Sequence, residues 1–225
     1  MSRLLAIQAE TVIVADDHPL FRTAIKEALE ADQGATRFLE ASSFEGLQEL
    51  VDKHREVDLV LLDLHMPGVS GFAGLVYLCK RYPSVPVVII SANEDPVVIR
   101  RALEHGAAGF IPKSSSIDTI TEAIGEVLMG EIWSPAKTKS SLPGSNVSEM
   151  ELAERMAQLT PQQFKVLMMM SQGLLNKQIA FDLGVSEATI KAHVTAIMNK
   201  LGVSNRTQAV LAASQLSVMD PNSSL

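Results

Sequence analysis

The sequence contains one cysteine and has no long apolar run. With Cys79 alone among 225 residues, an intramolecular disulfide and a cysteine-based metal site are both excluded, as is usual for proteins of a reducing compartment. The first ten residues hold too short an apolar stretch for a signal peptide, and no run approaches the length of a membrane span. We therefore expect a soluble cytoplasmic protein with no membrane partner.

The chain has enough apolar residues for real cores, and its charge is unevenly distributed. Hydrophobic residues make up 47% of it, which argues against wholesale disorder, and its length suggests one large or two modest domains. Residues 1–133 carry 11 basic and 20 acidic residues, whereas residues 159–217 carry 5 and 2. A small basic region tethered to an acidic one suggests nucleic acid as a partner, although an excess of three charges is weak support on its own.

Apolar runs and helical patterns alternate five times over the first 130 residues. Each run is short enough for a strand, and the run at 59–62 is apolar throughout, which suits a strand buried on both faces. The pattern predicts an α/β fold with a doubly wound, five-stranded parallel sheet and helices on both faces. The expected strands are 11–15, 37–41, 59–62, 86–90 and 109–112.

The remainder of the chain shows no strand signal. Residues 134–148 are rich in Ser, Pro, Gly, Asn and Lys and read as a linker, with a capping box at Ser148–Glu151 that opens a short helix to about Gln158. Residues 159–217 predict four helices. The second and third are joined by the turn Gly184–Ser186, as in a helix-turn-helix, and Ser204 is expected to cap the fourth. The predicted domains are thus 1–133, a linker with a short helix at 134–158, a helix-turn-helix domain at 159–217 and a disordered tail at 218–225.

Polar side chains follow four of the predicted strands. Asp16 and Asp17 end the first strand, Asp63 the third, Ser91 the fourth and Lys113 the fifth. Carboxyl ends of parallel strands meet at one edge of the sheet, so these groups are expected to converge. Clustered carboxylates suit a hard cation such as Mg²⁺, and with an ammonium and a hydroxyl they suit a phosphoryl group that a carboxylate attacks. Taken singly, each residue could equally be a helix cap or a solvated group.

Four segments of the first domain closely resemble the receiver domain of bacterial response regulators. They are VIVADDHPLFR, LVLLDLHMPGVSG, VVIISA and GAAGFIPKS. The resemblance implies a flavodoxin-like fold with Asp63 as the phosphoacceptor. It further implies Mg²⁺ held by Asp16, Asp17, Asp63 and the backbone carbonyl of His65, with Lys113 at the site and with Ser91 and Phe110 as the switch residues. The alternative for Phe110 is an ordinary core residue.

Residues 159–210 resemble the LuxR/NarL-type helix-turn-helix, with Gln163 where the family usually carries Glu. Gln can still close the capping box. For His193, a structural role between helices is the stronger interpretation. The resemblance implies that Lys191, Ala192 and Thr195 face base edges and that Lys177, Ser186, Thr189, Lys200 and Arg206 face phosphates. So few charges per copy suggest that tight binding requires a dimer.

These observations predict a two-component response regulator of the LuxR/NarL type, a transcription regulator and not an enzyme. Phosphorylation of Asp63 by a sensor histidine kinase would switch a homodimer that binds double-stranded promoter DNA, with RNA polymerase as a further partner. Before phosphorylation, the acidic receiver is expected to dock over the recognition surface. The last helix would then pair two copies through Ala209, Val210, Ala212 and Ala213.

Two alternatives remain open at this point. A magnesium-dependent phosphatase could also form an aspartyl-phosphate, but His65 stands where such enzymes place a second carboxylate, and no substrate-covering insertion is visible. A DNA-binding protein with a degenerate receiver would act without phosphorylation. The intact set of Asp17, Asp63, Ser91 and Lys113 argues against it.

Overall fold

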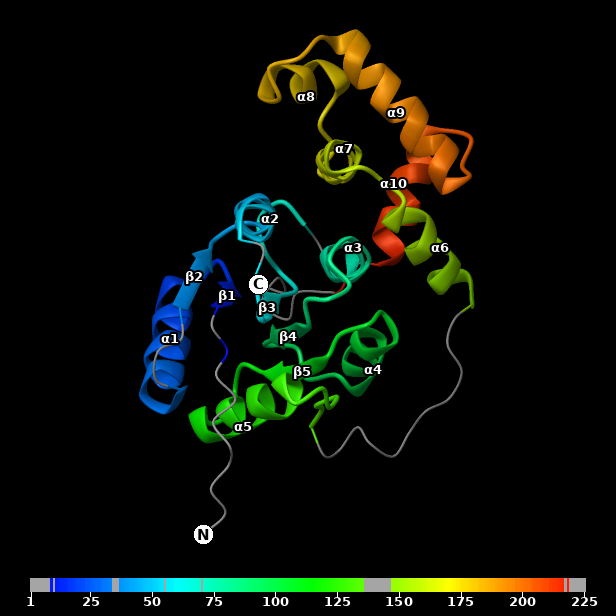
Figure 1. The fold of residues 1–225 in the computed structure, drawn as a ribbon. Coiled ribbons are helices and arrows are strands. Elements are labelled where there is room, and N and C mark those ends of the chain that lie inside the picture. The colour runs from blue at the N-terminus through cyan, green and yellow to red at the C-terminus, as the bar shows by residue number, and fades with distance from the viewer. Residues whose placement is uncertain are drawn as a thin grey trace, which may run out of the picture.

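The computed structural model describes residues 9, 11–33, 37–54, 56–69, 71–135, 147–216 and 218. Its first part is a parallel sheet in the order β2-β1-β3-β4-β5, which confirms the predicted doubly wound fold (Figure 1). The strands are β1 (Thr11–Ala15), β2 (Arg37–Ala41), β3 (Leu59–Asp63), β4 (Val87–Ser91) and β5 (Gly109–Pro112). The helices are α1 (Pro19–Gln33), α2 (Phe44–Lys53), α3 (Ala73–Arg81), α4 (Pro96–Glu104) and α5 (Ile117–Leu128).

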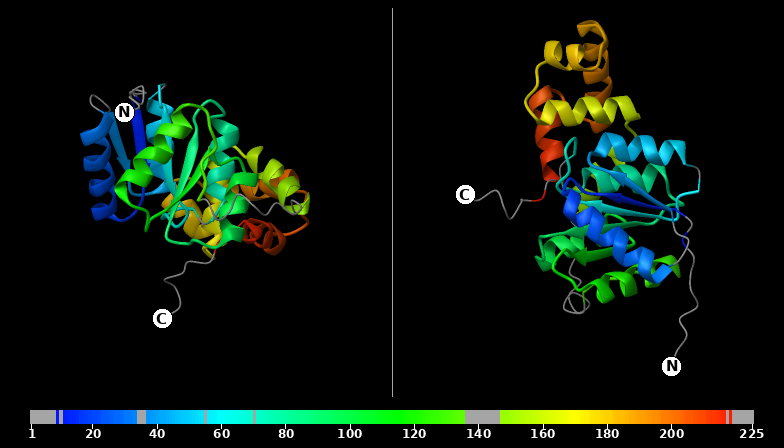
Figure 2. Two further views of the ribbon diagram at one scale, coloured as in Figure 1. Left: turned by 90° about the horizontal axis from the view of Figure 1, so that it is seen from below. Right: turned by 90° about the vertical axis from the view of Figure 1, so that its left-hand side faces the viewer.

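The central strands β1, β3 and β4 are buried at every position because helices cover both faces of the sheet (Figure 2). Since successive side chains alternate between faces, each strand contributes to two cores. Ile13 and Leu62 belong to the core under α2, α3 and α4. Val14 and Leu61 belong to the core under α1 and α5. A strand buried on both faces cannot tolerate a polar residue in its middle, so the polar groups collect at the strand ends.

The second part consists of helices, as predicted. They are α6 (Val147–Ala157), α7 (Pro161–Ser171), α8 (Asn176–Asp182), α9 (Glu187–Leu201) and α10 (Arg206–Gln215). Thr160 and Gln163 form the predicted capping box of α7, and Ser186 caps α9.

Four local expectations about the second part need correction or fall outside the described residues. The cap of α10 is Asn205, whose side chain accepts from the Gln208 amide, and not the neighbouring Ser204. Helix α6 begins at Val147, one residue before its expected cap. Most of the predicted linker, residues 136–146, and residues 219–225 of the predicted tail lie outside the described residues. Val218, the first residue of that tail, is buried.

The two parts share one continuous apolar cluster. Helix α6 packs along α3, and the cluster under α2, α3 and α4 continues into the interior of the helical part (Figures 1 and 2). At its centre the Phe164 ring of α7 lies 5.5 Å from the ring of Phe44 and 4.6 Å from that of Tyr77. An ion pair between Lys165 and Glu45 flanks these rings. The helical part is thus seated on the α2–α3 face of the sheet domain.

Helices able to cross a lipid bilayer are absent from the described part of the chain, where none combines the required length and apolar character.

Gly74 of helix α3 packs so closely against this cluster that no larger residue fits at its position without displacing its neighbours. A Cβ at Gly74 would lie 2.8 Å from Cε2 of Phe44 and 3.1 Å from Cγ2 of Val69, and the Phe44 ring is held by Tyr77 and Phe164. Gly74→Ala should therefore lower the free energy of unfolding by about 1–3 kcal/mol through overpacking. Gly125→Ala in α5, where an added Cβ meets nothing within 4 Å, should raise it by about 0.5–1 kcal/mol. Urea unfolding of both variants checks this, and a Gly74→Ala variant as stable as the unchanged chain would contradict it.

Candidate functional site

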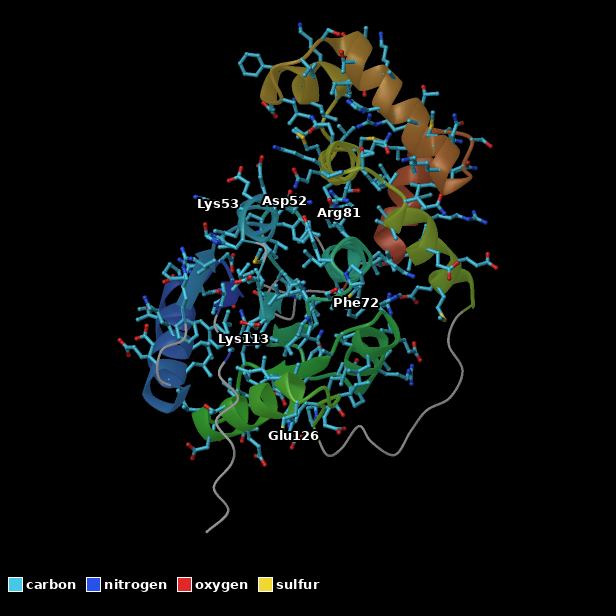
Figure 3. All side chains as sticks on the ribbon, in the orientation of Figure 1. Asp52, Lys53, Phe72, Arg81, Lys113 and Glu126 are labelled. Carbon is cyan, nitrogen blue, oxygen red and sulfur yellow. The ribbon has the colours of Figure 1, made fainter. Side chains whose placement is uncertain are left out.

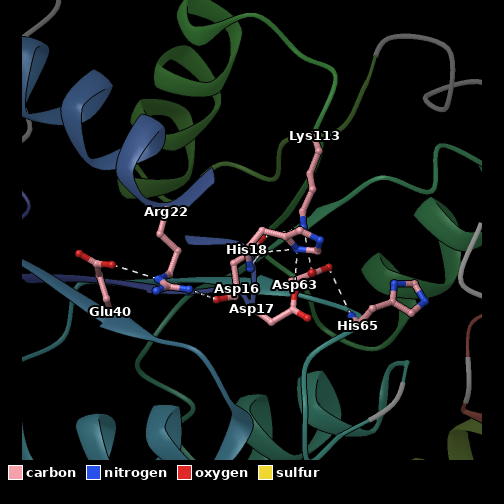
Figure 4. A network of polar contacts seen from close by, with 8 residues as sticks. All are labelled: Asp16, Asp17, His18, Arg22, Glu40, Asp63, His65 and Lys113. Atoms are coloured by element: carbon pink, nitrogen blue, oxygen red, sulfur yellow. Dashed lines mark hydrogen bonds and ion pairs between the residues drawn. The ribbon is translucent and has the colours of Figure 1, made fainter. Parts of the chain in front are cut away.

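Two buried carboxylates and one ammonium meet at the carboxyl edge of the sheet. Asp16 follows β1 and Asp63 ends β3, and they are 1% and 3% exposed. Lys113, directly after β5, places its Nζ 2.7 Å from Asp16 Oδ2 and 2.9 Å from Asp63 Oδ2 (Figure 4). The structure therefore brings together three of the residues that the strand ends predicted to converge.

The lysine at this site is held in its charged form. Burial of the ammonium acts to lower the pKa of Lys113, but its hydrogen bonds to Asp16 and Asp63 and the charge of these carboxylates outweigh burial and raise it. The Phe21 ring centroid, 5.0 Å from Nζ, adds a further favourable contact for the cation. A positive charge thus lies beside the Asp63 carboxylate, where it can neutralise the negative charge on the oxygens of an incoming or bound phosphoryl group.

The donor set at this edge suits a divalent cation. Ligand atoms of Asp16, Asp17, His18 and Asp63 all lie within 4.8 Å of one another. Three carboxylates supply the hard oxygen ligands that Mg²⁺ prefers, and a single nearby lysine does not balance their charge. Asp17 is exposed, so it can reach a cation that keeps water ligands. The acidic cluster therefore has the chemistry typical of a magnesium site.

His18 and Arg22 belong to this network, although the strand-end reasoning did not single them out. His18 Nδ1 lies 2.7 Å from Asp17 Oδ1 and 3.1 Å from Asp16 Oδ1. Arg22 donates through Nη1 to the Asp16 carbonyl at 2.7 Å and through Nε to Glu40 at 3.0 Å (Figure 4). Both residues lie within six positions of Asp16 at the start of α1, so their closeness in sequence was the available signal.

Of the remaining receiver residues predicted to act, His65 contacts Asp63, while Ser91 ends β4 and Phe110 lies on β5. The His65 amide donates to Asp63 Oδ1 at 3.3 Å, and the Lys113 amide donates to the Ser91 carbonyl at 2.8 Å. The Ser91 hydroxyl oxygen accepts from the Asn93 amide at 3.2 Å, and Ser91 and Phe110 are both fully buried. Ser91 is therefore tied through the backbone to the lysine that contacts Asp63. The switch roles of Ser91 and Phe110 stay predictions.

A second candidate surface lies on the helix-turn-helix. Lys191, Ala192 and Thr195 of α9 are exposed, while Ile190 and Val194 of the same helix are buried. Lys177, Ser186 and Thr189 are also exposed on or beside the two helices, and Ser186 caps α9 at the same time. This exposed set leaves the predicted base-facing side of α9 accessible.

Two of the predicted phosphate-facing cations are engaged inside the domain. Lys200 donates to the Gln158 carbonyl and to Gln163 Oε1, both at 2.8 Å. Arg206 donates to Asn176 Oδ1 at 2.9 Å and to the Leu174 carbonyl. These contacts tie α9 to α7 and α10 to α8, which is a structural use of the two cations. Their contact with phosphate stays a prediction, as does that of Lys177. His193 is half-buried, in keeping with a position between helices.

The receiver does not cover the recognition surface in this structure, contrary to the expected docking. It contacts α6, α7 and the end of α10 instead. Of the small residues expected to pair two copies, Ala209, Ala212 and Ala213 are buried within the chain and Val210 is half-buried. Leu211 is the large apolar side chain that α10 exposes.

A charged cluster links α4 of the receiver to α6. Glu149 Oε1 accepts from Arg101 Nη2 at 2.6 Å and lies 2.8 Å from Nε2 of His105. Burial acts to raise the pKa of Glu149, but the hydrogen bonds and charges of His105 and Arg101 outweigh it and hold this pKa below its ordinary value. The sequence had suggested only a helix-capping role for this segment, because its partners lie 44 and 48 residues away.

Both parts of the chain match known families. Residues 12–125 match the response regulator receiver domain, and residues 157–213 match the bacterial regulatory proteins of the luxR family.

Known proteins resemble the chain over almost its whole length. A glycerol metabolism activator of Pseudomonas putida is 41% identical over 210 residues, which cover 91% of this chain and 95% of that protein. The nitrate/nitrite response regulator NarL of Escherichia coli is 31% identical over 206 residues, which cover 89% of this chain and 93% of that protein. The structure of the response regulator RcsB in complex with DNA has a TM-score of 0.55 at 24% sequence identity. The match covers 94% of this chain and 100% of the RcsB chain, and it supports the fold.

The lowered pKa of Glu149 predicts an acid-sensitive contact between the two parts. Its carboxylate stabilises the contact fully above its ordinary pKa of 4.5, and this contribution is lost as the pH falls through the lowered value. As the pH falls through that range, the two parts of the unchanged chain should separate. In Glu149→Gln they should be more separated already at neutral pH, and their separation should change less with pH. Glu151→Gln is the control, because Glu151 is exposed. Small-angle scattering against pH checks this, and identical curves for Glu149→Gln and the unchanged chain would contradict it.

Proposed function

The chain belongs to the two-component response regulators of the LuxR/NarL type, which regulate transcription, and from this premise we propose that Asp63 is its phosphoacceptor. The observation that carries the proposal is the placement of Lys113 between Asp16 and Asp63. These groups lie where three strands of one sheet end, beside a cluster of carboxylates suited to Mg²⁺. A receiver with this set is competent to accept a phosphoryl group.

In the proposed reaction, a carboxylate oxygen of Asp63 attacks the phosphorus of the donor. An oxygen–phosphorus bond forms on Asp63, while the bond between phosphorus and its leaving group breaks, and the leaving group departs with the electron pair. With a sensor histidine kinase the leaving group is a histidine nitrogen, and with acetyl phosphate it is acetate. Lys113 contributes positive charge to the phosphoryl oxygens. Asp16, Asp17, Asp63 and the His65 carbonyl would hold Mg²⁺, which supplies further charge neutralisation when bound.

The phosphorylated receiver would then change its contacts with the DNA-binding domain. Ser91 ends β4, the strand next to that of Asp63, and Phe110 lies on β5 beyond it. In this proposal the two residues report the phosphoryl group towards α4. We assign the receiver to residues 1–133, the linker with its helix to 134–158, the DNA-binding domain to 159–217 and the tail to 218–225.

The second domain would read double-stranded promoter DNA through α9. Lys191, Ala192 and Thr195 would contact base edges, and Lys177, Ser186, Thr189, Lys200 and Arg206 would contact phosphates. RcsB, which shares the fold, has been solved as dimers bound to DNA. Two copies would double the small number of phosphate contacts that one domain offers, so we propose a homodimer on DNA that acts on RNA polymerase.

Asp63→Asn should abolish phosphorylation by acetyl phosphate with Mg²⁺, because an amide oxygen is not a competent nucleophile here. Asp118→Asn, which alters an exposed acid of α5, should be phosphorylated like the unchanged chain. Intact-mass spectrometry checks both variants, and chelation of Mg²⁺ should suppress the product in the control. A full phosphoryl increment on Asp63→Asn would refute the assignment.

Lys191→Ala should weaken binding to a specific site much more than binding to random DNA, because a base-edge contact discriminates by about 1–3 kcal/mol. Lys177→Ala should weaken both by similar factors, since a phosphate contact carries no sequence information. Fluorescence anisotropy on a specific and a scrambled duplex at one salt concentration measures the two ratios. Equal losses for Lys191→Ala would move this residue to the phosphate-contacting group.

A further inference from the structure

The end of α10 is held by the receiver through three main-chain carbonyls. The Gln215 carbonyl accepts from Arg101 Nη2 at 2.7 Å, the Leu216 carbonyl accepts from the Phe72 amide at 2.7 Å, and the Val218 carbonyl lies 3.3 Å from His65 Nε2. The last carbonyls of any helix lack partners within that helix. Here the receiver supplies donors to the end of α10, and the positive charge of Arg101 is favourable at that end of the helix dipole.

Apolar contacts reinforce these hydrogen bonds. Leu216 is fully buried and Val218 is 7% exposed, and both belong to the apolar cluster that the two domains share. Phe72 lies at the start of α3 near α4, with its ring 4.8 Å from the guanidinium carbon of Arg101 (Figure 3). The end of α10 is therefore seated in the receiver with both its main chain and its side chains.

One receiver residue joins this contact to the proposed phosphorylation site. The His65 amide donates to Asp63 Oδ1, while its imidazole contacts the Val218 carbonyl. A phosphoryl group on Asp63 would bring three strong acceptor oxygens to the amide side of His65. A shift of His65 towards these oxygens would alter its contact with Val218.

We propose that Leu216 and Val218 form a latch, which Phe72 and His65 of the receiver hold while Asp63 is unmodified and release when Asp63 is phosphorylated. The proposal rests on the proposed role of Asp63. What the latch restrains is α10 and not the DNA-reading face, since Lys191, Ala192 and Thr195 are exposed while the latch is closed. Release would free the C-terminal end of α10 from the receiver.

The latch and the modification of Asp63 are thermodynamically linked, so the effect of each on the other can be measured. If modification of Asp63 weakens the latch, then weakening the latch must favour the modified state by the same factor. Beryllofluoride with Mg²⁺, a non-covalent phosphoryl mimic, turns this into an equilibrium binding measurement on the full-length chain. Val218→Ser weakens the apolar seating of the latch, whereas His65→Ala removes the imidazole that contacts the latch main chain. Val203→Ser and His54→Ala are matched controls on half-buried residues outside the latch.

Isothermal titration should show beryllofluoride binding about 5- to 20-fold more tightly to Val218→Ser and to His65→Ala than to the unchanged chain, as expected for the loss of one buried contact. The double variant should bind no more tightly than either single variant, because a latch that one substitution has already opened cannot be opened further by the other. Both controls should bind like the unchanged chain. General loosening of the structure would not produce this non-additive pattern, so the cycle separates a latch from damage.

Unchanged affinity in Val218→Ser, or additive effects in the double variant, would overturn the latch while leaving phosphorylation of Asp63 intact. Failure of the unchanged chain itself to bind beryllofluoride would instead overturn the role of Asp63, and the latch with it. Circular dichroism of each variant establishes that the compared chains are folded.

Discussion

The placement of one ammonium between two buried carboxylates is the interaction on which the site depends. Asp16 and Asp63 are almost inaccessible to water, and two carboxylates so placed repel each other unless a cation lies between them. Lys113 forms an ion pair with both carboxylates, and it can do so because it directly follows β5 at the sheet edge where β1 and β3 end. The parallel sheet therefore makes an acidic site possible in this fold, because it brings a lysine and two carboxylates from distant chain segments to one edge.

The same sheet carries the contact with the DNA-binding domain on a different surface. Helices α2 and α3, which cover one face, offer Phe44 and Tyr77 to Phe164, while α4 offers Arg101 and His105 to Glu149. The loop after Asp63 touches the site with its main chain and the end of α10 with its His65 side chain. His65 thus connects the proposed phosphorylation site at the sheet edge with the contact that holds the second domain.

The sequence was sufficient for the features that depend on local pattern. Asp16, Asp63 and Lys113 could be placed together because each follows an apolar run, and parallel strands bring such ends to one edge. Asn205 was missed as a cap because Ser204 beside it is an equally good one. The partners of Glu149, Lys200 and Arg206 could not be foreseen, since they depend on how helices dock and not on spacing along the chain. The accessible face of α9 escaped prediction for the same reason, because net charge indicates attraction between domains but not which surfaces meet.

The shared apolar cluster has a consequence for how the molecule denatures. Two domains with separate interiors melt independently, whereas domains whose interiors are continuous lose structure together. Because residues from Ile13 in the sheet to Leu216 after α10 belong to one cluster, the seated arrangement should behave as one cooperative unit in calorimetry. A chain whose domains have parted should show two transitions. The shape of the heat-capacity curve, independent of any DNA or phosphate measurement, therefore reports how many cooperative units the protein contains.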